Sequence, residues 1–246
     1  MKSLDYSIGL KLWSTNTSLY KHIQKIYKNK QIQYLELYVV PKTYSSTIQI
    51  WSSLNMPVII HTPNKSILDI SEHITFFTEA QQFADHLQAP HIIIHPGSGN
   101  INKNIQQLIR FNDNRILIEN MPFYSLHKNE VLNGSDPNNM LQILSATGYG
   151  LCLDIGHAIT AAHNLGIKYY ELIESFSVLN PQIYHLNDGG FNNKKDQHLH
   201  FGQGNYPLKK IMQQIPSGAK ITLETPKNIE GNLSDFIVDL EHLKNL

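Results

Sequence analysis

The chain has 246 residues, of which 41% are apolar, so it can bury one large core, and we expect a single domain over residues 1–246. Its 20 basic and 20 acidic residues cancel, which excludes a global field that would attract nucleic acid, an anionic membrane or a polyanion. The composition departs from average in its 13 histidines, against only 16% charged residues. This excess indicates a site that uses imidazole groups.

The single cysteine, Cys152, excludes an internal disulfide and fits a reducing compartment. The chain begins without a basic segment followed by an apolar run, and no stretch approaches the roughly 18 apolar residues of a membrane span. We therefore expect a cytoplasmic protein without a membrane partner.

Short runs of β-branched and aliphatic residues recur along the chain and predict eight strands. They are Tyr6–Trp13, Tyr34–Val40, Pro57–His61, His91–His95, Arg115–Glu119, Gly150–Asp154, Ile183–Leu186 and Ala219–Glu224. Apolar residues at three-to-four spacing predict the helices Leu19–Lys28, Ser71–Leu87, Pro137–Ala146, Lys168–Leu179, Pro207–Gln214 and Leu233–Leu243, with weaker signals at Thr47–Leu54 and Ile105–Phe111. This alternation favours a (β/α)8 barrel, with a doubly wound open sheet as the competing arrangement.

Six consecutive predicted strands end in, or next to, a potential metal ligand: His61, His95, Glu119, Asp154, His185 and Glu224. Any one of them has an ordinary explanation, since a strand-end histidine or acid commonly organises a turn. The series of six as a whole has no such ordinary explanation, because burying unpaired charges is costly. Parallel strands bring their carboxyl ends together, so these side chains are expected to converge.

The segment Pro181–Gly204 adds Asp188, Asp196, His198 and His200 in a glycine-rich loop, and His157 follows Asp154 closely. Nine donors result: His61, His95, Glu119, Asp154, His157, His185, Asp196, His198 and Glu224. This set can supply two or three ions, and mixed imidazole and carboxylate ligands suit Zn²⁺, with Mn²⁺ or Fe²⁺ possible at carboxylate-rich positions. Clustered metals activate water and neutralise a phosphoester, so phosphoester hydrolysis is the expected use.

The motifs HTP at 61–63, HPG at 95–97, EN at 119–120, LDIGHA at 153–158, HLND at 185–188, DQHLHFGQG at 196–204 and LETP at 223–226 span Val58 to Pro226. In this order they resemble endonuclease IV, the family of apurinic/apyrimidinic endonucleases with a trinuclear zinc site, within the xylose isomerase-like barrel superfamily. The resemblance implies a phosphoester substrate in abasic DNA.

The resemblance also implies a role for each donor. A first zinc would lie on His61 and His95, with Glu119 bridging to a second zinc on Asp154, His185 and Glu224, and a third would lie on His157, Asp196 and His198. Hydroxide between the first two ions would attack phosphorus, and Glu224 would orient or deprotonate the water. Glu119 and Glu224 are therefore the expected catalytic carboxylates.

Two segments depart from that family. Its members begin with a signature near GAHVS, where this chain has Ile8–Ser14, and they insert an aromatic and aliphatic pair into DNA where this chain has Asn64 and Lys65. The DNA-contacting loops are therefore unmatched.

Sugar or sugar-phosphate isomerases and epimerases of the same superfamily are the main alternative. They use one divalent metal, for which Glu119, Asp154, His185 and Glu224 suffice, and the two glutamates would exchange a proton with substrate carbon while His157 touches substrate. The other donors would then be substrate contacts or bystanders. A metal-stabilised binding protein without catalysis is a third possibility.

Further residues have possible supporting roles. Asp188 and His200 are candidates for fixing ligand tautomers, Lys194 and Lys195 for holding phosphate, and Trp13 with Tyr38 for walling a substrate pocket. Each also has an ordinary reading as a loop, solvated or core residue.

Overall fold

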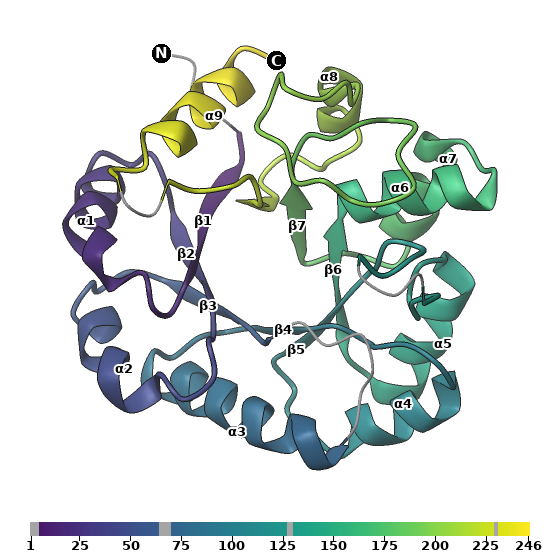
Figure 1. The fold of residues 1–246 in the computed structure, drawn as a ribbon, viewed down its shortest axis with the longest axis horizontal. Coiled ribbons are helices and arrows are strands. Elements are labelled where there is room, and N and C mark those ends of the chain that lie inside the picture. Colours follow the sequence, from purple (N-terminus) through teal and green to yellow (C-terminus); the bar gives the residue numbers. More distant parts are fainter. Residues whose placement is uncertain (1–4, 64–69, 127–129, 229–230) are drawn as a thin grey trace.

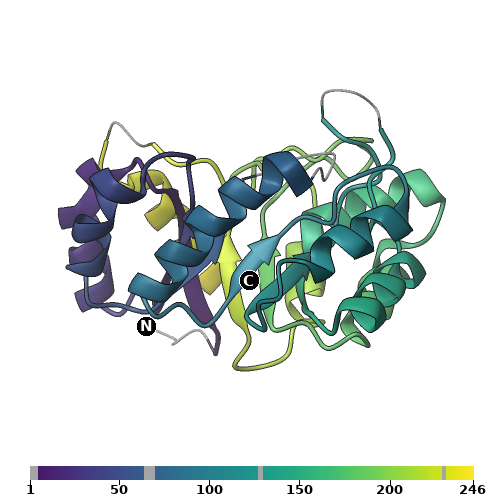
Figure 2. The same cartoon turned by 90° about the horizontal axis from the view of Figure 1, so that it is seen from below.

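The computed structural model describes residues 5–63, 70–126, 130–228 and 231–246. Eight parallel strands form a closed barrel in sequence order, and β1 pairs with β8 to complete it. The closure confirms the predicted (β/α)8 barrel and excludes the open sheet. Figure 1 looks along the barrel, and the helices form a ring outside the strands, as the side view in Figure 2 also shows.

The strands are β1 (Ser7–Trp13), β2 (Tyr34–Tyr38), β3 (Val58–His61), β4 (Ile92–Ile94), β5 (Ile116–Glu119), β6 (Gly150–Asp154), β7 (Ile183–Leu186) and β8 (Lys220–Leu223). The helices are η1 (Thr17–Leu19), α1 (Tyr20–Lys28), α2 (Tyr44–Ser52), α3 (Ile70–His86), α4 (Ile101–Ile109), α5 (Pro137–Thr147), α6 (Ile155–Leu165), α7 (Tyr169–Ser177), α8 (Leu208–Met212) and α9 (Ser234–Lys244). All eight predicted strands are present, with ends that differ by a few residues.

One helix, α6, was missed by the sequence analysis. Its residues from Ile155 to Ala162 are all buried, so the helix lacks the exposed polar stripe of a surface helix. The two ends of the helix are marked by single capping residues. The Asp154 carboxylate accepts the backbone N–H of His157 at the start, and Gly166 takes a left-handed conformation at the end.

The barrel interior is layered, as expected for this fold. One buried layer consists of Tyr34, Ile59, Ile93, Leu117, Cys152 and Ile183. Each of these residues lies two positions before a polar residue, namely Glu36, His61, His95, Glu119, Asp154 and His185. Because side chains two apart in a strand share a face, an apolar layer supports a polar layer at the carboxyl ends.

Tyr34 in β2 packs over Gly9 of the neighbouring strand β1. A Cβ atom at position 9 would lie 2.2 Å from the Tyr34 ring, so only glycine leaves room for this contact. The Tyr34 hydroxyl thereby reaches Thr222 in β8. In the described part of the chain, no helix combines the length and apolar character needed to span a membrane.

Candidate metal centre

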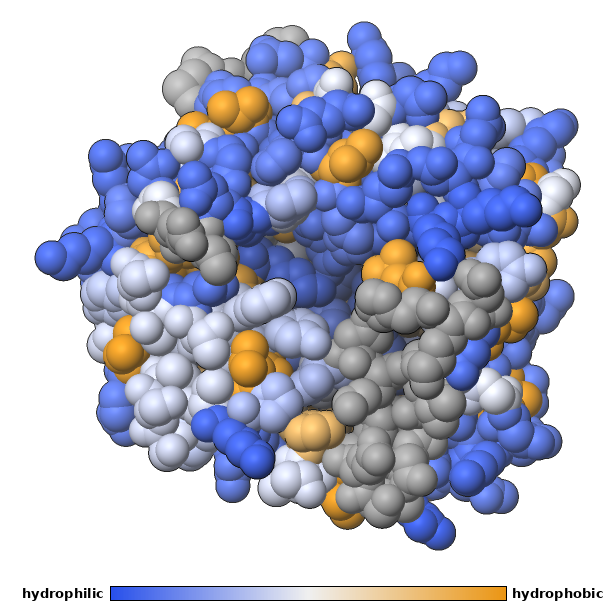
Figure 3. All heavy atoms as spheres, in the orientation of Figure 1, coloured by the Kyte–Doolittle hydropathy of each residue, from blue (hydrophilic) through white to orange (hydrophobic). Residues whose placement is uncertain are grey.

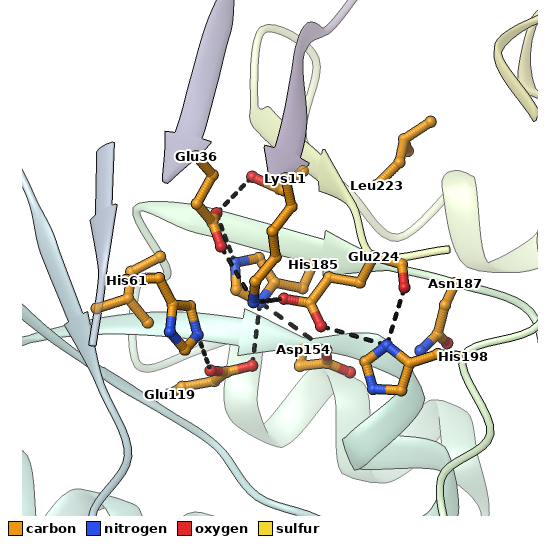
Figure 4. Close-up of polar contacts among 12 residues, drawn as sticks. Lys11, Glu36, His61, Glu119, Asp154, His185, Asn187, His198, Leu223 and Glu224 are labelled. Atoms are coloured by element: carbon orange, nitrogen blue, oxygen red, sulfur yellow. Dashed lines mark hydrogen bonds and ion pairs between the residues drawn. The ribbon is translucent and has the colours of Figure 1, made fainter. Parts of the chain in front are cut away.

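The nine predicted donors gather at the carboxyl ends of the strands. Figure 4 labels His61, Glu119, Asp154, His185, His198 and Glu224 among them. His61, Glu119 and Asp154 end β3, β5 and β6, while His95 and Glu224 directly follow β4 and β8. His185 is the penultimate residue of β7, His157 lies in the first turn of α6, and Asp196 and His198 come from the loop after β7. Their ligand atoms form three groups within which all atoms lie within 4.8 Å of one another.

The first group is His61, His95 and Glu119. The Nε2 atoms of His61 and His95 lie 3.0 and 2.7 Å from the same Glu119 oxygen, Oε2. All three residues are buried. Two imidazole nitrogens converging on one carboxylate oxygen are suited to a divalent cation of the zinc class.

The second group is Glu119, Asp154, His185 and Glu224. His185 Nδ1 lies 3.0 Å from Glu119 Oε1 and 2.8 Å from Glu224 Oε1. Asp154 Oδ2 is buried without a hydrogen-bond partner, 3.9 Å from the same nitrogen. Burial raises the pKa of Asp154 to about 6, although the charge of His157 opposes the shift. A buried carboxylate oxygen without a partner fits a cation site.

The third group is His157, Asp196 and His198. His157 Nε2 lies 3.7 Å from Asp196 Oδ2, which His198 Nε2 also contacts. The Nδ1–H groups of the two histidines donate to backbone carbonyls, 2.8 Å from Asn120 and 2.9 Å from Glu224. Because a carbonyl can only accept, both rings present Nε2 to Asp196.

Two residues of the site were missed by the sequence analysis, Lys11 on β1 and Glu36 on β2. Lys11 Nζ contacts Glu224 Oε1 and lies 3.2 Å from Glu36 Oε1 (Figure 4). Glu36 forms a further candidate group with His61, His185 and Glu224. The signal for Glu36 was its strand parity, since it occupies in β2 the position that His61 occupies in β3, two residues beyond the shared apolar layer.

A cavity of about 750 Å³ opens onto these groups, on the hollowed face seen in Figure 3. Trp13 and Tyr38 line it, as predicted, and Leu126 lines it from another loop. The Trp13 side chain is 56% exposed, and the Tyr38 ring lies 6.2 Å from the Trp13 ring and 5.5 Å from the His61 ring. An aromatic wall thus leads from solvent to the first group.

The other predicted supporting residues do not line this cavity. Asp188 accepts backbone N–H groups of its own loop, and His200 donates to Asp239, 2.8 Å away. Lys194 is exposed, and Lys195 donates to the Leu126 carbonyl at 2.6 Å. Asp188, His200 and Lys195 therefore hold loop segments in place and are not members of the donor groups. Asn64 and Lys65 lie outside the described residues.

Known proteins resemble this chain in sequence or in fold. The chain is 23% identical over 234 residues to an uncharacterised protein of Methanocaldococcus jannaschii, covering 84% of this chain and 75% of that one. Its fold matches endonuclease IV of Thermus thermophilus with a TM-score of 0.70 at 18% identity, covering 98% and 100% of the two chains. It also matches a D-tagatose 3-epimerase-like protein with a TM-score of 0.68 at 18% identity, covering 96% and 98%.

At this identity the two solved structures support the fold and leave open which reaction the site performs. The model of one family, described as the xylose isomerase-like TIM barrel, matches residues 47–246. The eight-stranded barrel and the donor groups at its carboxyl ends agree with this match. The chain therefore belongs to the xylose isomerase-like TIM barrel family.

Proposed function

We propose that this protein is a metal-dependent phosphoester hydrolase with a di- or trinuclear, zinc-type site of the endonuclease IV kind. The observation that carries the proposal is the third group, His157, Asp196 and His198. Chemistry at a single cation needs only the second group. In the third group His157 and Asp196 are buried and His198 is half-buried. The group shares a cavity with the others and has its imidazoles oriented, which supports a site for several cations.

In this proposal, divalent cations bound at the three groups would lower the pKa of a water molecule and offset charge on the phosphate. Glu119 would join the first and second groups, because its Oε2 faces His61 and His95 while its Oε1 faces His185. Glu224 would orient the attacking water and accept its proton, since its carboxylate lies between His185 and His198.

The substrate would enter through the cavity beside Trp13. Its volume of about 750 Å³ accommodates a phosphoester the size of one nucleotide or a sugar phosphate. An abasic nucleotide rotated out of DNA would also meet the site in this way. The zero net charge provides no broad phosphate-binding surface, so the cations themselves would attract the substrate.

Isomerisation or epimerisation of a sugar or sugar phosphate is the second candidate. The observation in its favour is that Glu119, Asp154, His185 and Glu224 alone form a complete set for one cation. The two glutamates flank His185, where they could exchange a proton with opposite sides of a substrate carbon. Under this alternative, the reaction would not require a cation at the third group.

Metal content and activity of purified protein separate the two candidates. For the hydrolase, we expect two to three zinc ions per chain and cleavage of abasic-site duplex or a small phosphodiester. The substitution His198→Ala should remove one ion and reduce hydrolysis at least a hundredfold. One manganese or cobalt ion per chain, with proton exchange into a ketose and no cleavage, would establish the alternative.

The matched control for the third group is His163→Ala. His163 is exposed on the same helix as His157 but lies outside all four donor groups. We expect this variant to retain the full metal content and activity. If His163→Ala and His198→Ala lose metal equally, the assignment of the third group is wrong.

A further inference from the structure

His185 is held differently from the other site histidines. His61, His157 and His198 each donate Nδ1–H to a backbone carbonyl and present Nε2 to the donor groups. His185 has the opposite orientation, with Nδ1 facing Glu119 and Glu224. Its Nε2 faces the Glu36 carboxylate, whose Oε2 is 2.9 Å away.

A chain of hydrogen bonds fixes the direction of each proton around Glu36. The Glu36 carboxylate is ion-paired with Lys11 and can therefore only accept, so His185 Nε2–H and the Thr222 hydroxyl both donate to Glu36 Oε2, the latter at 2.7 Å. Since the Thr222 proton is used in this way, the Tyr34 hydroxyl must donate to Thr222 Oγ1, 2.8 Å away. All four side chains are at most 2% exposed.

Glu36 is kept ionised by its neighbours. Its Oε2 accepts hydrogen bonds from His185 Nε2–H and the Thr222 hydroxyl. The other carboxylate oxygen, Oε1, lies 3.2 Å from Lys11 Nζ. Each oxygen of this fully buried carboxylate therefore faces a positively polarised partner.

We propose that Glu36 is the positioning residue of the metal centre: it holds Nε2–H of His185, and so keeps the Nδ1 lone pair directed at Glu119, Asp154 and Glu224. A carboxylate behind a metal-binding imidazole orients the ring and raises its basicity. This inference rests on the metal site of the proposed function and is independent of the reaction performed there. In this role Glu36 orients the His185 ring and does not itself bind the metal.

The test compares Glu36→Gln with Tyr34→Phe, after each protein has been stripped with a chelator and titrated with Zn²⁺ in competition with a chromophoric indicator. We expect Glu36→Gln to weaken the tightest zinc binding 10- to 100-fold. Tyr34→Phe removes only the far end of the hydrogen-bond chain, so it should lower stability while changing zinc affinity less than threefold.

Histidine-selective ¹⁵N labelling supplies a second readout that packing alone would not move. The zinc-loaded wild type and Tyr34→Phe should share a downfield, slowly exchanging His185 Nε2–H resonance, which should move upfield in Glu36→Gln. Zinc affinity of Glu36→Gln within threefold of wild type would overturn the proposal. Equal weakening by Tyr34→Phe would also overturn it, because the effect would then come from packing.

Should Glu36→Gln fail to fold, the variant Lys11→Met/Glu36→Gln replaces both members of the Lys11–Glu36 ion pair. Its reference is Lys11→Met. Glu224 loses the Lys11 ammonium in this variant and in its reference alike, so that loss cancels in the comparison. We expect the double variant to bind zinc 10- to 100-fold more weakly than that reference, and equal affinity would reject the role of Glu36. Zinc binding by the wild type is measured in the same titration, so failure of the proposed metal site is seen separately.

Discussion

The Lys11 ammonium contacts Glu224 Oε1, the same oxygen that lies 2.8 Å from His185 Nδ1 (Figure 4). Lys11 is thus placed where it neutralises a carboxylate of the second donor group. Burial by itself would lower the pKa of Lys11, but the nearby glutamates, Glu224 foremost, raise it. A cation entering the second group must therefore compete with a charged ammonium for Glu224.

Replacement of Lys11 by methionine should have opposite effects on stability and on metal affinity. Without zinc, two buried carboxylates lose their counter-ion, so the free energy of unfolding should fall by about 2–4 kcal/mol. With the competing cation gone, zinc affinity should rise roughly tenfold, which corresponds to about 1.4 kcal/mol. Chemical denaturation and zinc titration measure the two effects.

The control for this substitution is Lys168→Met, because the Lys168 side chain is 67% exposed and its ion pair is with Glu171, which is also exposed. Both quantities should stay near their wild-type values. Weaker zinc binding in Lys11→Met would mean that Lys11 holds Glu224 in place instead of competing for it.

The sequence predicted the barrel and the convergence of donors for a physical reason. In a parallel barrel the strand ends meet at one face, so His61 and Glu224 are neighbours of the same site although 163 positions apart in the sequence. The end of a strand can be predicted from the sequence where a polar residue follows an apolar run.

The residues that were missed lie where this signal is absent. Glu36 and Lys11 are single polar residues within apolar strands, and their partners, His185 and Glu224, lie on β7 and just after β8. Glu36 and Lys11 are seen to belong to the polar layer only once the closed barrel shows which residues of each strand point inward. Helix α6 was missed because its residues from Ile155 to Ala162 are buried and leave no exposed polar stripe to mark a helix. Asp154, which caps it, is also typical of a metal ligand.

Asp188 anchors the loop that carries Asp196 and His198 of the third group. Its two oxygens accept four backbone N–H groups, from Gly189, Gly202, Gly204 and Tyr206, at 2.8 to 3.1 Å. Asp188→Asn keeps the volume but directs an N–H group at two of these donors. We expect stability to fall by about 2–4 kcal/mol and zinc content to fall by one ion, measured by denaturation and elemental analysis.

Asp136→Ala is the comparison for the loop anchor, since Asp136 caps α5 and accepts two backbone N–H groups at 3.0 Å. Its loss should cost about 1 kcal/mol without changing zinc content. A full complement of zinc in folded Asp188→Asn would show that the loop does not depend on this anchor for metal binding.

Trp13 provides a direct reporter of substrate binding. The chain has two tryptophans; Trp13 is 56% exposed, whereas Trp51 is 1% exposed and donates to the Ser14 carbonyl. Ligand binding should change the emission of the wild type but not of Trp13→Ala. Because Trp13 lies at the mouth, the variant should raise KM about three- to tenfold, as expected for about 1 kcal/mol of lost ring contact, with kcat within twofold. A fall in kcat at constant KM would contradict this placement.

Asp113 gives a prediction on pH that is independent of the metal site. Hydrogen bonds from the Arg115 side chain, together with its backbone N–H and Gln81, lower the pKa of Asp113 to about 2 despite burial. In the unfolded chain this pKa is about 3.9, so the unfolded state binds more protons between the two values. The contribution of Asp113 is therefore complete above about pH 4 and is lost as pH falls towards 2.

Asp113→Asn should accordingly lower the free energy of unfolding at pH 7 by about 1–2 kcal/mol, after allowance for partial solvent screening. Urea denaturation between pH 7 and pH 3 should show the difference from wild type shrinking only below about pH 4. Asp85→Asn is the control, since Asp85 faces the same guanidinium at 2.8 Å but its side chain is 68% exposed; it should change stability by less than about 0.5 kcal/mol. A difference for Asp113→Asn that is constant over this pH range would show that the loss comes from packing, because a volume effect does not titrate.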